Sequence, residues 1–213
     1  VTYRPPGLLA KIVTTLDVLS GGRAMLGIGA AWYERAHLGL GVSFPPISER
    51  FERLEESLQI VRQMWSINNG PYQGEYYSLD EAICEPAPLS QPHPPIMIGG
   101  SGERKTLRLV AKYADACNLF ARPDTGPEAV AAKLQVLESH CEDQGTEFSR
   151  IRKTILWAAS VDPTSPAGGD DFVEQMRGFA DVGITEVHVM PFHEPVAFIR
   201  GLGDNVVPTL SAL

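Results

Sequence analysis

The sequence predicts an α/β fold built on a parallel sheet, either a doubly wound sheet or a (β/α)8 TIM barrel. Short apolar runs alternate with longer segments of helical periodicity, as in successive strand–helix units. The chain has 213 residues, enough for one substantial core, and no low-complexity tract or linker divides it. We therefore expect a single domain over residues 1–213. A complete barrel needs eight strands and about 250 residues, so a barrel here would lack its first two to three strands.

Individual elements follow from the period of the apolar positions and from the turn residues that bound them. Helices are expected over residues 6–20, 49–66, 103–114, 127–144, 170–182 and about 195–212. Strands are expected over 24–29, 95–98, 116–120, 153–161 and 185–190, with a strand stub at 1–4. Residues 67–94 contain a hairpin pattern and five nearby prolines, and this long excursion is predicted to be an insertion or a lid.

Composition narrows the classes of partner. The formal net charge is −8, which argues against nucleic acid and against an anionic membrane surface. No apolar run approaches the roughly 20 residues that span a bilayer. The three cysteines and five histidines match no metal-ligand spacing, so no metal is expected. Reduced thiols favour a cytoplasmic protein, and the expected partner is a small-molecule substrate. The unpaired strand edges of an incomplete barrel would favour instability or association, for example as a homo-oligomer.

The first candidate site is the glycine-rich turn at residues 99–102, Gly-Gly-Ser-Gly, between a predicted strand and a predicted helix. Free N–H groups at a helix start, with the Ser101 hydroxyl and Arg104 or Lys105, would bind a phosphate. The alternative is a tight turn in which Ser101 only caps the helix. Glycine turns occur in many α/β proteins, so the turn alone does not decide between these.

The second candidate site is the segment that follows the strand 24–29. Small residues at its end leave room for a flat ring, which Trp32 and Tyr33 could border. Glu34 could handle a proton and is the one catalytic candidate. Alternatively, the glycines serve packing and the aromatic rings fill the barrel mouth. Asn118 is a further candidate ligand at a strand end, unless its amide is merely satisfied by backbone groups.

Three motifs resemble the luciferase-like monooxygenase family, in the class of F420-dependent oxidoreductases. The most specific is Leu-Asp-Val-Leu-Ser-Gly-Gly-Arg at 16–23, within residues 11–33. The helix opening Glu-Arg-Phe-Glu-Arg-Leu-Glu-Glu at 49–56 is similar too. So is the proline-rich approach to Pro-Ile-Met-Ile-Gly-Gly-Ser-Gly at 95–102. The resemblance covers essentially the whole chain.

The resemblance implies a luciferase-like (β/α)8 barrel that binds coenzyme F420 or, alternatively, FMN, and that is truncated at its N-terminus. Gly99, Gly100, Ser101 and Gly102 would hold the cofactor phosphate, whereas Gly29, Ala30 and Tyr33 would lie near its ring. Alanine at position 30, where FMN-binding members often carry a basic residue, favours the deazaflavin. The family's usual active-site histidine or aspartate would precede Val1.

The implied activity is hydride transfer between F420 and a small organic substrate. An FMN-dependent monooxygenase of the same fold is the first alternative. The others are a catalytically silent cofactor-binding protein or fragment, and an unrelated barrel that binds a sugar phosphate at residues 99–102.

Overall fold

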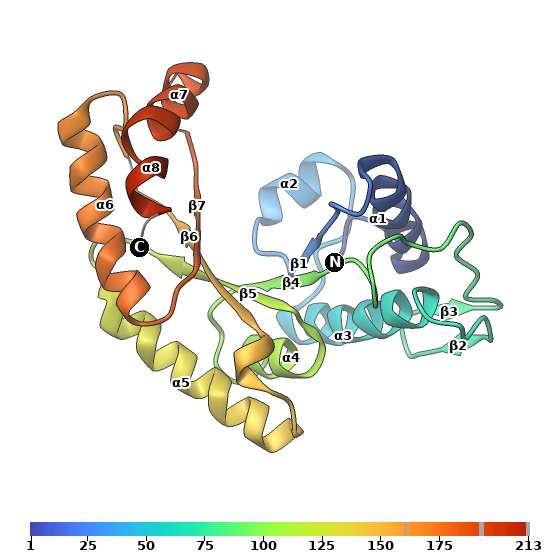
Figure 1. Cartoon of the computed structure of the whole chain (residues 1–213). Coiled ribbons are helices and arrows are strands. Elements are labelled where there is room, and N and C mark those ends of the chain that lie inside the picture. Colours follow the sequence, from blue (N-terminus) through green and yellow to red (C-terminus); the bar gives the residue numbers. More distant parts are fainter. Residues whose placement is uncertain (160, 192–193, 212–213) are drawn as a thin grey trace. The chain divides into compact units, whose positions relative to one another are not determined.

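The structure is a computed structural model that describes residues 1–159, 161–191 and 194–211. These residues form two compact units, which are described separately below. Unit 1 comprises residues 1–99 and 113–115, and unit 2 comprises residues 100–112 and 116–213. Figure 1 labels the helices and strands of both units.

Unit 1 is built around two paired helices and two parallel strands. Helix α1 packs against α3, and β1 pairs in parallel with β4 so that the central residues Gly27 and Met97 are partners (Figure 1). A short antiparallel hairpin, β2–β3, completes the unit. Its elements are α1 (Pro6–Ser20), β1 (Leu26–Ile28), α2 (Glu34–Gly39), α3 (Ile47–Met64), β2 (Tyr72–Gln73), β3 (Ser78–Leu79) and β4 (Ile96–Gly99).

Unit 2 contains three adjacent parallel strands in the order β5, β6, β7, connected by α5 and α6. Its elements are α4 (Thr106–Tyr113, whose last residue falls in unit 1), β5 (Ala116–Ala121), α5 (Gly126–Gln144), the 3-10 turn η1 (Phe148–Arg150), β6 (Arg152–Trp157), α6 (Pro166–Asp181), β7 (Glu186–Val189), α7 (Pro195–Asn205) and α8 (Val207–Leu210).

The two faces of the unit 2 sheet carry different residues, because side chains alternate along a strand. Trp157 of β6 is buried and packs edge-on against Phe172 and Phe179 of α6, with ring centroids 6.2 and 5.8 Å away. The opposite face carries polar side chains, among them Asn118 of β5 beside Thr154 of β6. Helix α6 therefore covers the face that carries Trp157, and Asn118 and Thr154 lie on the other face.

Most predicted elements are present, and the exceptions have physical causes. Residues 1–4 form a turn instead of a strand, and α2 was not predicted because residues 34–39 lack an apolar stripe. The last predicted helix is divided into α7 and α8 at Val206. Five parallel strands lie in the described part of the chain, fewer than the eight of a closed barrel.

The face that α1 buries differs from the face that its apolar residues predict. Of the apolar residues with helical spacing, Val13 is buried and Leu9 is half-buried, whereas Ile12, Leu16 and Leu19 are exposed; the helix buries Ala10 and Thr14 beside Val13. Gly21 ends the helix as predicted, in the left-handed conformation at φ +70, which glycine adopts without a steric penalty.

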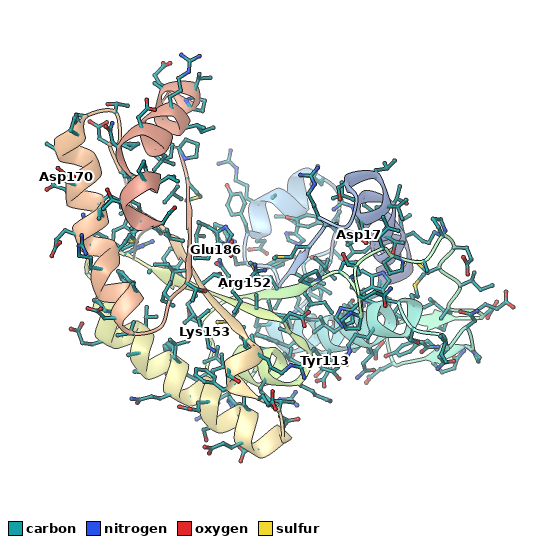
Figure 2. All side chains as sticks on the ribbon, viewed as in Figure 1. Asp17, Tyr113, Arg152, Lys153, Asp170 and Glu186 are labelled. Carbon is teal, nitrogen blue, oxygen red and sulfur yellow. The ribbon has the colours of Figure 1, made fainter. Side chains whose placement is uncertain are left out.

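Asp17 of α1 ties this turn to the proline-rich segment before β4. Asp17 is labelled in Figure 2. Its carboxylate is fully buried and accepts hydrogen bonds from Ser90 N–H at 2.8 Å, the Ser90 hydroxyl at 2.7 Å and Ala24 N–H at 3.4 Å. Burial raises the pKa of Asp17, but the hydrogen bonds outweigh burial, and the net pKa is lowered from 3.8.

We expect Asp17→Asn to destabilise the protein by about 1–3 kcal/mol at pH 7, because the amide presents an N–H group to donors that need an acceptor. Since the folded-state pKa is depressed, the carboxylate stabilises the fold above the unfolded value and this contribution is lost as pH falls through the folded pKa. Urea unfolding of the wild type and of Asp17→Asn, at pH 7 and below pH 3.8, measures the difference in the free energy of unfolding at each pH.

The matched control is Asp162→Asn, because Asp162 is exposed and, among the described residues, its carboxylate accepts hydrogen bonds from Thr164, two positions along the chain. This variant should lose much less stability at pH 7. An Asp17→Asn protein as stable as the wild type at pH 7 would contradict the assigned role.

Candidate functional site

The turn after β4 is held against β5 by two hydrogen bonds. Gly100 N–H donates to the Asn118 carbonyl at 3.0 Å, and the Ser101 hydroxyl accepts from Phe120 N–H at 3.1 Å. Helix α4 starts at Thr106, so the predicted start at residue 103 is wrong. The alternative in which Ser101 caps this helix is also wrong, because the helix begins at Thr106 and the Ser101 hydroxyl accepts from Phe120 N–H of β5. Residues 101–105 therefore form an extra loop ahead of the helix.

Glycine is required at two positions of this loop. Gly100 has φ +124, a conformation that side chains disfavour, and an added Cβ would lie 3.3 Å from Thr106 Cγ2. At Gly102 an added Cβ would lie 2.9 Å from Thr106 Oγ1. Thr106 is buried and has little room to move. By contrast, a Cβ at Gly99 would meet open space.

The loop presents backbone donors. Within the described part of the chain, no group accepts from the N–H groups of Gly102, Glu103, Arg104 or Thr106. Three of these four residues are exposed, and Thr106 is the first residue of α4. Unpaired N–H groups and the positive end of a helix dipole favour an anion. The exposed Arg104 side chain adds a positive charge at the same loop.

Helix α5 anchors the loop through Glu103. The Glu103 carboxylate pairs with Lys133 at 2.5 Å, and its carbonyl lies 2.8 Å from His140 Nε2. The hydrogen bond and charge of Lys133 lower the pKa of Glu103. These partners lie 30 and 37 residues away, so no local sequence pattern could have found them.

Asn118 faces the polar side of the unit 2 sheet. Its Nδ2 donates to Thr154 Oγ1 at 2.8 Å, and that hydroxyl donates to the Cys117 carbonyl at 2.8 Å. The Asn118 amide therefore bonds to a side chain, whereas the alternative interpretation supposed that backbone groups satisfy it. No donor to Asn118 Oδ1 is found among the described residues, which leaves an acceptor for a ligand.

The second candidate segment, residues 29–34, follows β1 in unit 1. Gly29 lies so close to β4 that an added Cβ would be 3.2 Å from the Gly99 carbonyl oxygen. Trp32 and Tyr33 are 84% and 45% exposed, with ring centroids 5.1 Å apart. Glu34 is exposed at the start of α2 and has no ion pair or hydrogen bond to any other described side chain.

The prediction missed Arg50 of α3, which fixes the 29–34 segment. It is only 8% exposed, and its NH1 group donates to the Ala31 carbonyl at 2.6 Å and the Ala30 carbonyl at 3.2 Å. The only available signal was a charged residue within a helix, which is usually solvated.

Several other titratable residues of the described chain lie in unit 2. The Glu186 carboxylate of β7 lies 3.5 Å from the Arg152 guanidinium, and both residues are labelled in Figure 2. It also lies 3.2 Å from His188 Nε2, and His188 belongs to β7, within the predicted strand 185–190. The three cysteines are buried and free, and burial raises the pKa of Cys117. Across the described ranges, no group of three or more potential ligands could hold a metal, and no helix is long and apolar enough to cross a membrane.

These features define a class of protein: an α/β chain of parallel strands with a glycine-rich, donor-rich loop at a strand end. The model of the luciferase-like monooxygenase family matches residues 1–199, and the chain belongs to this family. The predicted fold class, an α/β chain forming part of a luciferase-like (β/α)8 barrel, is confirmed. The coenzyme F420-dependent tetrahydromethanopterin reductase from Methanopyrus kandleri has a similar fold, with a TM-score of 0.78 and 16% identity over 98% of this chain and 80% of that one.

Two relatives carry different cofactors in their names. The F420-dependent glucose-6-phosphate dehydrogenase of Microbacterium testaceum is 29% identical over 92% of this chain. The present chain spans 55% of that relative's length. The FMNH2-dependent dimethylsulfone monooxygenase of Pseudomonas putida is 31% identical over 45% of this chain and 26% of its own.

Proposed function

We propose that the protein is an oxidoreductase that binds coenzyme F420 through its phosphate at the loop after β4. One observation carries the proposal: Gly102, Glu103, Arg104 and Thr106 have backbone N–H groups that no described residue accepts from, directly at the start of α4. A phosphate is the ligand that such donors favour. The name of the Microbacterium testaceum relative supports F420 as the cofactor.

Each predicted site residue takes a role in this proposal. Gly99, Gly100, Ser101 and Gly102 form the phosphate-binding backbone, in which Ser101 shapes the loop through Phe120 N–H. Arg104 supplies positive charge, and Asn118 offers its free Oδ1 to a donor on the cofactor. In unit 1, Gly29, Ala30 and Tyr33 contact the ring.

Bound F420 would supply hydride transfer to or from a carbon of a small organic substrate. The chain's own contribution is to bind and orient the reactants and to exclude water from them. Glu34 is the candidate for moving a proton, because it is an exposed carboxylate directly after the ring segment. We propose that the protein acts in the cytoplasm and that it forms a homo-oligomer.

The second candidate function is an FMN-dependent monooxygenase. It is favoured by the Pseudomonas putida relative, whose match covers 45% of this chain. FMN-binding members often carry a basic residue at position 30, where this chain has an alanine. The nearby Arg50 does not replace that basic residue, because its guanidinium donates to backbone carbonyls. We therefore rank this function below the F420-dependent one.

The test is a titration of the purified protein with F420 and with FMN, each paired with its phosphate-free parent, and followed by cofactor fluorescence. F420 is expected to bind about 100-fold more tightly than its phosphate-free chromophore, since two charge-assisted hydrogen bonds contribute about 3 kcal/mol. Preference for FMN would favour the second function. Binding of neither cofactor would overturn both, and binding of a sugar phosphate alone would identify a different kind of barrel.

A further inference from the structure

Arg50 contacts the 29–34 segment in an unusual way for a surface helix residue. Two consecutive carbonyls, those of Ala30 and Ala31, accept from its single NH1 group at 3.2 and 2.6 Å. Its Nε is buried and has no acceptor among the described residues. A buried donor without an acceptor is unfavourable. The position of the guanidinium is therefore explained by the two bonds from NH1 to the carbonyls, and Nε contributes no hydrogen bond to it.

An aromatic and a histidine ring support the guanidinium. Its carbon lies 4.0 Å from the ring centroid of Phe44, whose ring meets His37 edge-on at 4.7 Å. His37 is fully buried, with Nδ1 2.8 Å from the Tyr33 carbonyl and Nε2 2.6 Å from the Thr2 hydroxyl. A carbonyl only accepts, so Nδ1 carries the proton. Arg50 and His37 thus hold three carbonyls of one short segment.

The segment held in this way is strained and exposed on its other side. Ala31 has φ +61, a left-handed conformation that a residue with a Cβ adopts only when its surroundings impose it. The next residue, Trp32, is 84% exposed, so its side chain contributes little to fixing the backbone. The carbonyl bonds of Arg50 are therefore the interactions that keep Ala31 in this conformation.

We propose that Arg50 is a positioning residue, which fixes the backbone of residues 30–33 in the conformation that receives the cofactor ring. The inference rests on the proposed function, because Ala30 and Tyr33 are its ring-contacting residues. Arg50 acts through the backbone carbonyls and does not supply a ligand to the phosphate. Its loss should weaken binding of the ring and leave the contribution of the phosphate unchanged.

The experiment compares Arg50→Ala with Arg53→Ala, a control on the same helix. Arg53 is half-buried, pairs with Glu49 and stacks on Tyr76, away from residues 29–34. Arg50→Ala should weaken binding of the phosphate-free F420 chromophore about tenfold, the equivalent of one net hydrogen bond, with the affinity ratio between F420 and that chromophore unchanged. Arg53→Ala should change neither.

Chemical rescue separates positioning from a general loss of stability. Guanidinium chloride at a low, non-denaturing concentration should restore the affinity of Arg50→Ala, whereas urea at the same concentration should not. Time-resolved anisotropy of Trp32, measured without cofactor, should show faster local motion in Arg50→Ala and slower motion after guanidinium is added. Trp65 and Trp157 are buried and give a constant background.

Three outcomes would overturn the inference, and they differ from failure of the proposed function. Unchanged Trp32 motion, unchanged chromophore affinity in Arg50→Ala, or absence of rescue by guanidinium would each refute Arg50 as a positioning residue while wild-type binding persists. A wild-type protein that binds no cofactor would instead refute the proposed function, and the inference with it.

Discussion

Gly100→Ala is expected to lower the affinity for F420 by about 100-fold, and to leave the affinity for the phosphate-free chromophore within about twofold of the wild type. Gly100 has φ +124, and an added Cβ would lie 3.3 Å from Thr106 Cγ2. Thr106 is buried, so the loop must change its conformation instead. The loop would then withdraw its N–H groups from the phosphate of the proposed F420 site, whereas a ligand without a phosphate does not use them. Paired fluorescence titrations with the two ligands measure the ratio.

The control for this prediction is Gly145→Ala. Gly145 ends α5 in the same unit at φ +65, and an added Cβ would have no heavy atom within 4 Å. The variant introduces backbone strain of about 1–2 kcal/mol at a distance along the chain from the phosphate loop. Its affinity ratio should equal that of the wild type. A Gly100→Ala protein that keeps the wild-type ratio would show that the phosphate binds elsewhere.

The sequence predicted the buried residues of a helix correctly where the apolar residues at helical spacing are also the ones that tertiary packing buries. In the predicted helix 49–66, the apolar stripe comprises Phe51, Leu54, Leu58, Val61 and Trp65; Phe51 is half-buried and the other four are buried, with Trp65 directly after the end of α3. Strand positions were also predicted well, because short apolar runs between glycines and prolines have few other conformations. For α1 the pattern failed, since its apolar residues occupy two faces and only packing against α3 decides which face is buried.

Candidate site residues were predictable by position but not by role. Ser101 lies where a helix cap is expected, yet its hydroxyl accepts from Phe120, a residue 19 positions later. Arg50 and Glu103 were not distinguished from ordinary surface charges, because their partners come from other elements. A single sequence reports what is adjacent along the chain, whereas these roles depend on which strands and helices become neighbours.

The predicted lid, residues 67–94, has one part with a clear attachment. The Glu56 carboxylate of α3 accepts hydrogen bonds from three consecutive N–H groups, those of Glu75 at 2.7 Å, Tyr76 at 3.1 Å and Tyr77 at 3.0 Å. Ser90 at the far end is bound by Asp17. These contacts attach the hairpin to α3 and the proline-rich end to α1, and closure of the segment over a substrate stays a prediction.

We expect Glu56→Ala to release the hairpin from α3 and to raise hydrogen-exchange rates of the Glu75, Tyr76 and Tyr77 amides by roughly 30- to 150-fold. This range corresponds to about 2–3 kcal/mol, the contribution of hydrogen bonds to one charged group, reduced by water access at this surface. Native-state hydrogen exchange is the appropriate measurement, because it reads these three donors individually and does not require the whole protein to unfold in one step.

Glu52→Ala is the matched control one turn earlier on the same helix. Glu52 accepts one hydrogen bond, from the exposed Tyr76 hydroxyl at 2.6 Å, and none from the backbone of the hairpin. Its removal should leave exchange of the three amides within about threefold of the wild type, since exposed pairs contribute about 0–1 kcal/mol. Equal exchange rates in the two variants would mean that the Glu56 carboxylate does not hold the hairpin. If only Glu56→Ala raises the rates, residues 75–77 depend on α3 for their order, and a lid movement of residues 72–79 would require Glu56 to release them.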